Sequence, residues 1–122
     1  MPYAYEIQEK NEYFHFTVSG VLESTEELTH FSSAMMACAR DKGYTRVLFD
    51  ERATPKKMDQ HDWMVFADQW VLDNPREGMK VAAVYSSADV RAFHWIETIL
   101  QNRSILCKIF DDMDEAKRWL MS

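Results

Sequence analysis

Three ionisable side chains stand close together near the middle of the chain: Asp59, His61 and Asp62. A neutral imidazole beside carboxylates is a combination that can bind a metal ion or act as a general base. Side chains two or three residues apart at the start of a helix diverge, however, and no second His or Cys lies nearby in the sequence. We therefore favour a structural interpretation, in which Asp59 is a helix N-cap and the following acid suits the positive end of the helix dipole.

A second pair of carboxylates, Asp50 and Glu51, follows a short apolar stretch. Open α/β sheets commonly bind ligands at the carboxyl ends of their strands, and paired carboxylates can perform acid–base chemistry. No partner stands at a fixed spacing from this pair, so a solvated strand end is the favoured alternative. His94, between Phe93 and Trp95, can line a pocket, but a core or interface histidine is the favoured alternative there.

The sequence lacks the motifs of the common enzyme classes. Gly20, Gly43 and Gly78 stand alone, so no glycine-rich phosphate loop is present. There is no Gly-x-Ser-x-Gly elbow and no Cys-x-x-Cys pair. Ser86-Ser87 can present backbone N–H groups to an anion, although a simple helix cap is the stronger interpretation. Because no nucleophile, base and orienting group can be assembled, we predict a protein that is not an enzyme and has no cofactor or metal.

Large apolar side chains are more abundant than one buried face per helix requires. The sequence holds four Trp and eight Met. Met64 stands next to residues expected to face inward, so apolar residues occur on more than one face of its predicted helix. A small monomer rarely exposes a large apolar patch, and Met and aromatic side chains suit adaptable contacts. Three alternatives remain: core packing alone, a protein interface, or a groove for a small, lipid-like apolar ligand. Such a ligand would contact Trp70, Phe93 and Trp95.

Composition limits the class of protein. A chain of 122 residues, 47% of them hydrophobic, can bury one core, so we expect residues 1–122 to form a single domain. The net charge of −6 argues against nucleic-acid binding, which needs a basic surface. No apolar run is long enough for a transmembrane segment, and the N-terminus lacks a secretory signal. Cys38 and Cys107 lie in apolar segments, where buried reduced thiols are favoured over a disulfide. These features predict a cytoplasmic protein.

Hydrophobic periodicity predicts five strands and four helices in the order ββαβαβαβα. The strands are expected at 3–8, 13–18, 45–50, 79–85 and 105–110. The helices are expected to begin at Ser24, at Asp59, at Ser86 or Ser87, and at Asp111 or Asp112, and the third to continue to Gln101. A hairpin followed by strand–helix repeats implies an α/β domain with a mixed five-stranded sheet and right-handed crossovers.

Three stretches of the chain carry a resemblance to a known family. They are Phe16-Thr-Val-Ser-Gly-Val-Leu22, Arg46-Val-Leu-Phe-Asp50 and Ile109-Phe-Asp-Asp-Met-Asp-Glu-Ala116. Their order resembles that of the STAS domains, the sulfate transporters and anti-sigma-factor antagonists of the SpoIIAA type. The Ala-x-x-Trp-Leu ending is more similar still to SpoIIAA-like bacterial proteins of unknown function, whose fold is similar to that of lipid-binding CRAL-TRIO domains. The resemblance implies a STAS/SpoIIAA-like fold over nearly the whole chain.

One departure from the family pattern concerns phosphorylation. In the anti-sigma antagonists, an Asp-Ser-Ser-Gly-like turn opens the second helix and supplies the phosphorylated serine. In this chain Gln60 and His61 replace the hydroxyl residues, so the resemblance does not carry that switch over. Thr54, in the preceding loop, is the nearest hydroxyl.

The resemblance also implies a working surface. In the family, the loop after the central strand and the start of the second helix meet the partner protein. We therefore expect a non-enzymatic regulatory module that binds another protein, with a homodimer among the possibilities. The candidate contact residues are Asp50, Thr54, Lys56, Lys57, Asp59, His61 and Trp63.

Overall fold

The computed structural model describes residues 3–20, 24–54, 58–73 and 79–122. Its elements are β1 (Tyr3–Glu9), β2 (Phe14–Gly20), α1 (Thr25–Asp41), β3 (Arg46–Ala53), α2 (Gln60–Asp73), β4 (Lys80–Val84), α3 (Ser87–Ala92), α4 (Trp95–Gln101), β5 (Cys107–Phe110) and α5 (Met113–Leu120). The predicted α/β order is confirmed, with one change: the expected third helix is divided into α3 and α4.

The division of the third helix lies at Phe93 and His94. The backbone of Phe93 leaves the helical region, with φ −124° and ψ 26°, and caps α3. In one continuous helix, residues two positions apart, such as Phe93 and Trp95, point in different directions. The break instead brings the rings of Phe93 and Trp95 edge to face, 5.8 Å between centroids. The prediction of a single helix was therefore wrong, and Ala92, at the end of α3, is exposed.

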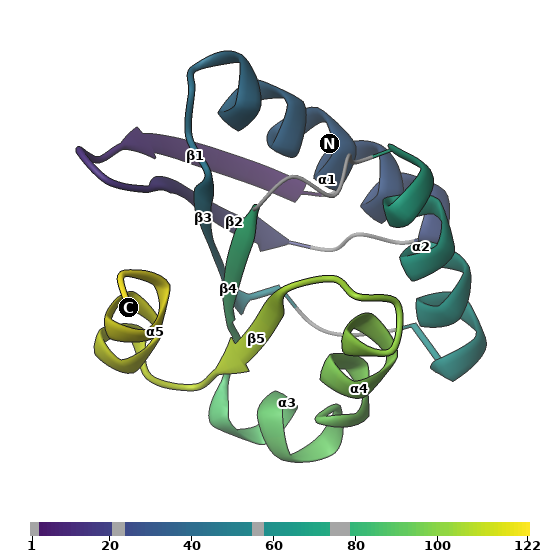
Figure 1. Cartoon of the computed structure of the whole chain (residues 1–122). Coiled ribbons are helices and arrows are strands. Elements are labelled where there is room, and N and C mark those ends of the chain that lie inside the picture. Colours follow the sequence, from purple (N-terminus) through teal and green to yellow (C-terminus); the bar gives the residue numbers. More distant parts are fainter. Residues whose placement is uncertain (1–2, 21–23, 55–57, 74–78) are drawn as a thin grey trace.

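The five strands lie in the sheet in the same order as in the chain, β1-β2-β3-β4-β5. β1 and β2 pair antiparallel as a hairpin, and the remaining neighbours pair parallel (Figure 1). The mixed sheet is thus confirmed. The pairing of β2 with β3 shifts register between Thr17 and Ser19, and this irregularity affects the geometry at the end of β3.

One face of the sheet carries the larger part of the core. Side chains alternate along a strand, so Phe14, Phe16 and Val18 share one face of β2, and all three are buried. They pack in one cluster with inward residues of the crossover helices, among them Phe31 of α1 and Trp63 of α2. The helices α1, α2 and α4 therefore cover this face together (Figure 1).

The opposite face is covered by α5. A smaller cluster there joins β3 and β4 to the last helix through Leu48, Ala82, Val84, Ala116 and Leu120. Asp112 caps α5 by accepting hydrogen bonds from the backbone N–H groups of Asp114 and Glu115, at 2.8 and 3.1 Å. Because β4 is buried on both faces, as its continuous apolar sequence predicts, it is the structural centre of the molecule.

Both cysteines are free thiols. Cys107 is buried on the main core face, whereas Cys38 is partly exposed on α1. The prediction of reduced cysteines is therefore confirmed, while the prediction that both are buried holds for Cys107 alone.

Candidate functional site

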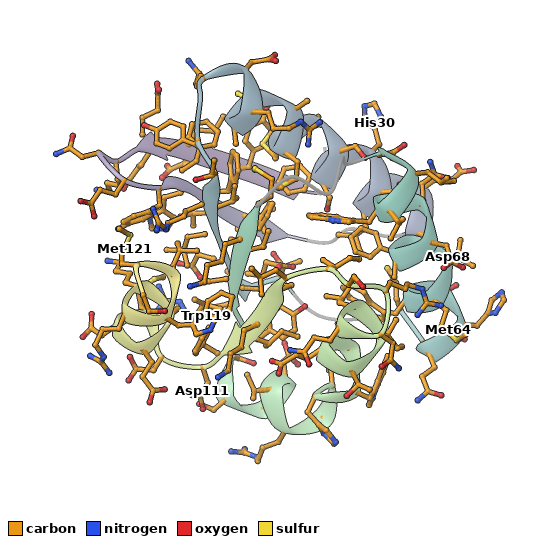
Figure 2. The ribbon with its side chains drawn as sticks, in the orientation of Figure 1. His30, Met64, Asp68, Asp111, Trp119 and Met121 are labelled. Atoms are coloured by element: carbon orange, nitrogen blue, oxygen red, sulfur yellow. The ribbon has the colours of Figure 1, made fainter. Side chains whose placement is uncertain are left out.

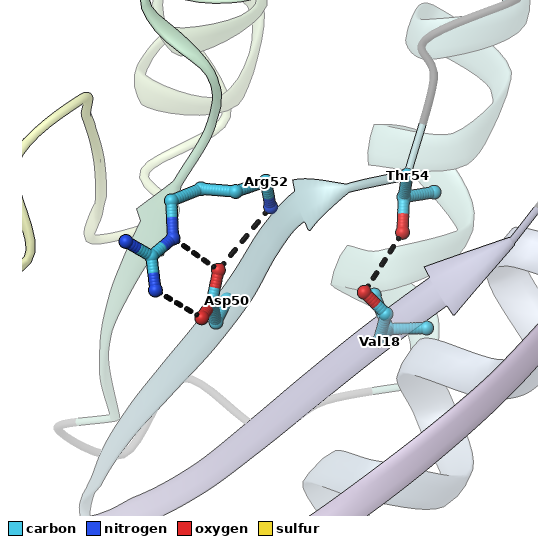
Figure 3. A network of polar contacts seen from close by, with 4 residues as sticks. All are labelled: Val18, Asp50, Arg52 and Thr54. Atoms are coloured by element: carbon cyan, nitrogen blue, oxygen red, sulfur yellow. Dashed lines mark hydrogen bonds and ion pairs between the residues drawn. The ribbon is translucent and has the colours of Figure 1, made fainter.

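The carboxylate of Asp50 lies at the carboxyl end of β3 and is held by a neighbour on the same strand. The Arg52 side chain donates from Nε to Oδ1 at 2.9 Å and from Nη2 to Oδ2 at 2.8 Å (Figure 3). The backbone N–H of Arg52 also donates to Oδ1, at 3.2 Å. Burial would raise the pKa of the Asp50 carboxyl, but the hydrogen bonds from Arg52 outweigh it and hold the pKa below its usual value.

Asp50 is therefore a structural anchor. Its residue is only 7% exposed, so the expectation that it contacts a partner is wrong. The favoured expectation that Asp50 and Glu51 form a solvated strand end is also wrong for Asp50. Its carboxylate accepts hydrogen bonds from the guanidinium group of Arg52 in place of water.

Thr54 is buried as well, at 3% exposure. Its Oγ1 donates a hydrogen bond of 3.1 Å to the carbonyl of Val18 (Figure 3). Val18 lies at the register shift between β2 and β3, so the threonine hydroxyl supplies a hydrogen bond where the regular ladder is interrupted. Thr54 is thus not a surface contact, so that expectation is corrected, and this nearest hydroxyl is buried in the fold.

The cluster at the start of α2 forms a reciprocal cap. Asp59 Oδ1 accepts from the backbone N–H of Asp62 at 2.9 Å, and Asp62 Oδ2 accepts from the backbone N–H of Asp59 at 3.2 Å. This is a capping box in which aspartate takes the place of the usual glutamate. The favoured N-cap interpretation is confirmed. Within the described ranges, no group of three or more His, Cys, Asp or Glu could hold a metal ion.

The other sequence candidates near this point separate into exposed, buried and undescribed residues. Asp59 and His61 are exposed at the beginning of α2. Trp63 is 4% exposed and packs edge to face on Phe66, with 5.3 Å between ring centroids, so it is a core residue and its expected contact with a partner is wrong. Lys56 and Lys57 lie outside the described residues.

The outer side of α2 carries apolar residues that the candidate set did not include. Met64 and Val65 are each 45% exposed, and Leu72 is 79% exposed. Figure 2 shows Met64 and Asp68 pointing away from the sheet. The sequence contained a signal for this surface, because apolar residues in 60–73 are too frequent for one helical stripe.

Polar and charged groups surround these apolar side chains. Asp68 forms an ion pair with Arg103, in which Asp68 Oδ1 lies 2.6 Å from Arg103 Nε. This ion pair connects α2 to the end of α4. Asp73 accepts hydrogen bonds from Gln69 and from Ser33 of α1, at 2.9 and 2.7 Å. Because Asp68 is four residues from both Met64 and Leu72, it lies between them on the helix, so apolar and charged groups alternate along this surface.

An open hollow of about 740 Å³ lies between α1 and α2, next to this surface. Its lining includes Val65 from α2 and the acidic Glu26 and Glu27 from the first turn of α1. His30 also lines it and is exposed (Figure 2). The acidic residues give the hollow a negative rim.

A smaller cavity of about 50 Å³ lies inside the main core face. Its described lining residues are Leu28, Phe31, Ser32, Phe49, Glu51, Trp63, Phe66, Trp70, Val81, Ala83, Tyr85, Leu100, Ile105 and Cys107. Of the three expected ligand contacts, Trp70 lines this cavity, whereas Phe93 and Trp95 pack against each other and do not. This cavity therefore contains one of the three candidate contacts, and an apolar site shared by all three stays a prediction.

The fold is similar to that of a solved anti-sigma factor antagonist from Mycobacterium paratuberculosis. The similarity covers 98% of this chain and 95% of that chain, with a TM-score of 0.67 and 8% sequence identity. The fold implied by the resemblance to STAS domains is thereby confirmed. No model of a protein family matches the sequence, and neither does any curated protein.

Among the residues that the structure describes, no helix combines the length and the apolar character needed to cross a lipid bilayer.

Proposed function

We propose that this chain is a non-enzymatic regulatory module that acts by binding another protein through α2. The observation that carries the proposal is the exposure of Met64, Val65 and Leu72 on a helix whose opposite side is already packed into the core. Exposed apolar groups of this kind mark interaction surfaces on small proteins. We define the α2 surface as Asp59, His61, Met64, Val65 and Leu72.

The fold similarity supports a regulatory role for this module. The solved protein with the same fold is an antagonist of an anti-sigma factor, which is a regulatory protein. The non-enzymatic character is supported by two reactive groups that are held inert. Both carboxylate oxygens of Asp50 are occupied by Arg52, and burial, with a smaller contribution from Glu51, raises the pKa of the Cys107 thiol and suppresses its thiolate.

The chemistry of the partner follows from the surface and its surroundings. Apolar side chains of the partner would cover Leu72 and Met64, while basic side chains would suit the acidic hollow beside them. A second copy of the chain, forming a homodimer, is one possible partner. Lys56 and Lys57 precede Asp59 in the sequence, and charge reversal at both lysines is predicted to weaken the complex with little change in thermal stability.

The proposal is tested by replacing apolar side chains of the α2 surface and comparing them with a matched control. Met64→Ser combined with Leu72→Ser removes two of its exposed apolar side chains, and Leu106→Ser changes a residue that is also exposed, at 54%, but lies just before β5. Losing one central contact typically costs about 2 kcal/mol of binding free energy, or roughly 30-fold in Kd.

Quantitative affinity purification from the host, together with sedimentation velocity for self-association, measures the effect. We expect partner proteins, or the dimer, to be retained by wild type and Leu106→Ser and lost with the double variant. Equal retention by all three proteins, with unchanged thermal unfolding, would exclude α2 as the binding surface.

A further inference from the structure

The indole N–H of Trp63 is a buried donor without a hydrogen-bond partner. Trp63 is 4% exposed, its Nε1 is shielded from solvent, and none of the described residues accepts from it. A buried donor left in this state costs about 1–3 kcal/mol, and buried polar groups in native proteins are nearly always satisfied. The donor therefore calls for an acceptor from outside the described chain.

Trp63 lines the 50 Å³ cavity of the main core face, so an acceptor has a place to bind. Most of the wall is apolar, formed by residues such as Phe49, Phe66 and Val81. A guest in this cavity would therefore gain free energy mainly from its apolar surface, and a single acceptor atom would satisfy the indole.

The electrostatics of the cavity argue against an anionic guest. Burial raises the pKa of Tyr85 and of Cys107, and the negative charge of Glu51 raises both further, so both groups are neutral. None of the described lining residues carries a positive charge. A carboxylate or phosphate would enter this environment without a compensating cation.

The cavity has an identifiable entrance. Glu51 and Trp70 are partly exposed, whereas every other described lining residue is buried. An engineered apolar cavity of about 150 Å³ binds benzene. A cavity of 50 Å³ therefore suits a molecule smaller than a benzene ring, or the terminal group of a longer molecule that extends past Trp70.

We infer that this cavity is a binding site for a small neutral molecule with an apolar body and one carbonyl-type acceptor, which accepts a hydrogen bond from Trp63 Nε1. The inference goes beyond the proposed function, since the α2 surface faces away from the cavity and either can hold without the other. It also differs from a lipid groove, because the cavity is too small for a fatty acyl chain.

Two small probes of similar shape test the inference: acetone, which has the acceptor, and 2-methylpropene, which does not. The indole ¹H–¹⁵N signal of Trp63 in the full chain is assigned by its disappearance in Trp63→Phe. We expect acetone to move this indole proton downfield saturably, and the hydrocarbon to leave its shift unchanged. In Trp63→Phe, followed through the backbone amides of Ala83 and Cys107, acetone should lose about tenfold in affinity, as expected for one hydrogen bond.

Two control variants locate the guest. Trp70→Phe keeps an aromatic ring at the entrance and should preserve the response of Trp63. Ala83→Val places extra methyl groups in the cavity and should abolish binding of both probes. The inference is overturned if acetone leaves the Trp63 indole signal unchanged, which would leave the cavity to water alone, or if binding survives Ala83→Val, which would place the guest elsewhere.

Discussion

His15, on the α5 side of β2, is a half-buried residue whose two ring nitrogens are shielded from solvent and lack partners among the described residues. Burial lowers its pKa from 6.5; Asp50 opposes this shift, while Lys117, Lys10 and Arg52 add to it. Since the pKa is lower in the folded state, the unfolded chain binds more protons over the interval between the two values. Stability present above about pH 6.5 is therefore lost as the pH falls toward the folded-state pKa.

We predict that wild-type protein is less stable to urea at pH 5.5 than at pH 7.5, and that His15→Asn reduces this difference. If His15→Asn and wild type lose equal stability over this interval, His15 is not the group responsible.

A second residue-scale prediction concerns the arginine at the end of β3. Arg52→Met keeps much of the aliphatic stem but removes the fork, and leaves the buried Asp50 carboxylate with fewer donors. Because hydrogen bonds to charged groups contribute about 1.5–3 kcal/mol, we expect a loss of that order in unfolding free energy, measured by urea titration at pH 7. Arg118→Met, on the exposed side of α5, should cost less than about 0.5 kcal/mol. Equal effects of the two substitutions would contradict the anchoring role of Arg52.

At the scale of single elements, α5 depends on its cap. Asp112 accepts two backbone hydrogen bonds, whereas the neighbouring Asp111 is exposed and is no part of the cap. We predict that Asp112→Ala destabilises the protein by about 1 kcal/mol, or roughly 4 °C in Tm, measured by calorimetry. Asp111→Ala should leave Tm within about 1 °C of wild type. A larger loss of Tm in Asp111→Ala than in Asp112→Ala would mean that Asp112 is not the residue that caps α5.

Sequence periodicity predicted the elements well where one face of each is buried. The alternation in Phe14–Val18 and the continuous apolar sequence of β4 have direct counterparts in the sheet. The break between α3 and α4 could not be predicted, because neither Gly nor Pro interrupts the segment, and the contact between the rings of Phe93 and Trp95 that accompanies it is visible only in the structure.

The candidate site was harder to predict than the fold, for a related reason. α2 is apolar around much of its circumference, so sequence alone does not show which side is buried. Trp63 was therefore assigned both to the core and to the partner surface, while Leu72 was not considered. The burial of Thr54 depends on the register shift opposite Val18, which leaves no sequence signal.

At the scale of the whole molecule, two cores share one sheet. Leu120 is fully buried against the α5 face, and the opposite face of β4 supports the larger core. Leu120→Ala should cost about 2–5 kcal/mol, and near-ultraviolet and far-ultraviolet circular dichroism should report one shared transition at lower urea. Leu106→Ala, at an exposed position, should change stability little. Separate transitions by the two probes would mean that the cores unfold independently.

The similarity to the mycobacterial protein at 8% identity shows that this fold does not depend on most of the individual residues. The two chains share few residues, yet the match spans nearly all of each. Pattern and order of elements are therefore sufficient for the architecture, which two chains with few residues in common can share.

The order of the strands also bears on how the protein is made. Each strand pairs with the strand that precedes it in the chain, so a nascent polypeptide can extend its sheet one strand at a time as it leaves the ribosome. The face formed by Leu48, Ala82 and Val84 is different, because it stays uncovered until residues 113–120 have been synthesised. A translation product that stops before α5 would present this apolar face to chaperones and proteases, and we expect it to be degraded while the full chain accumulates.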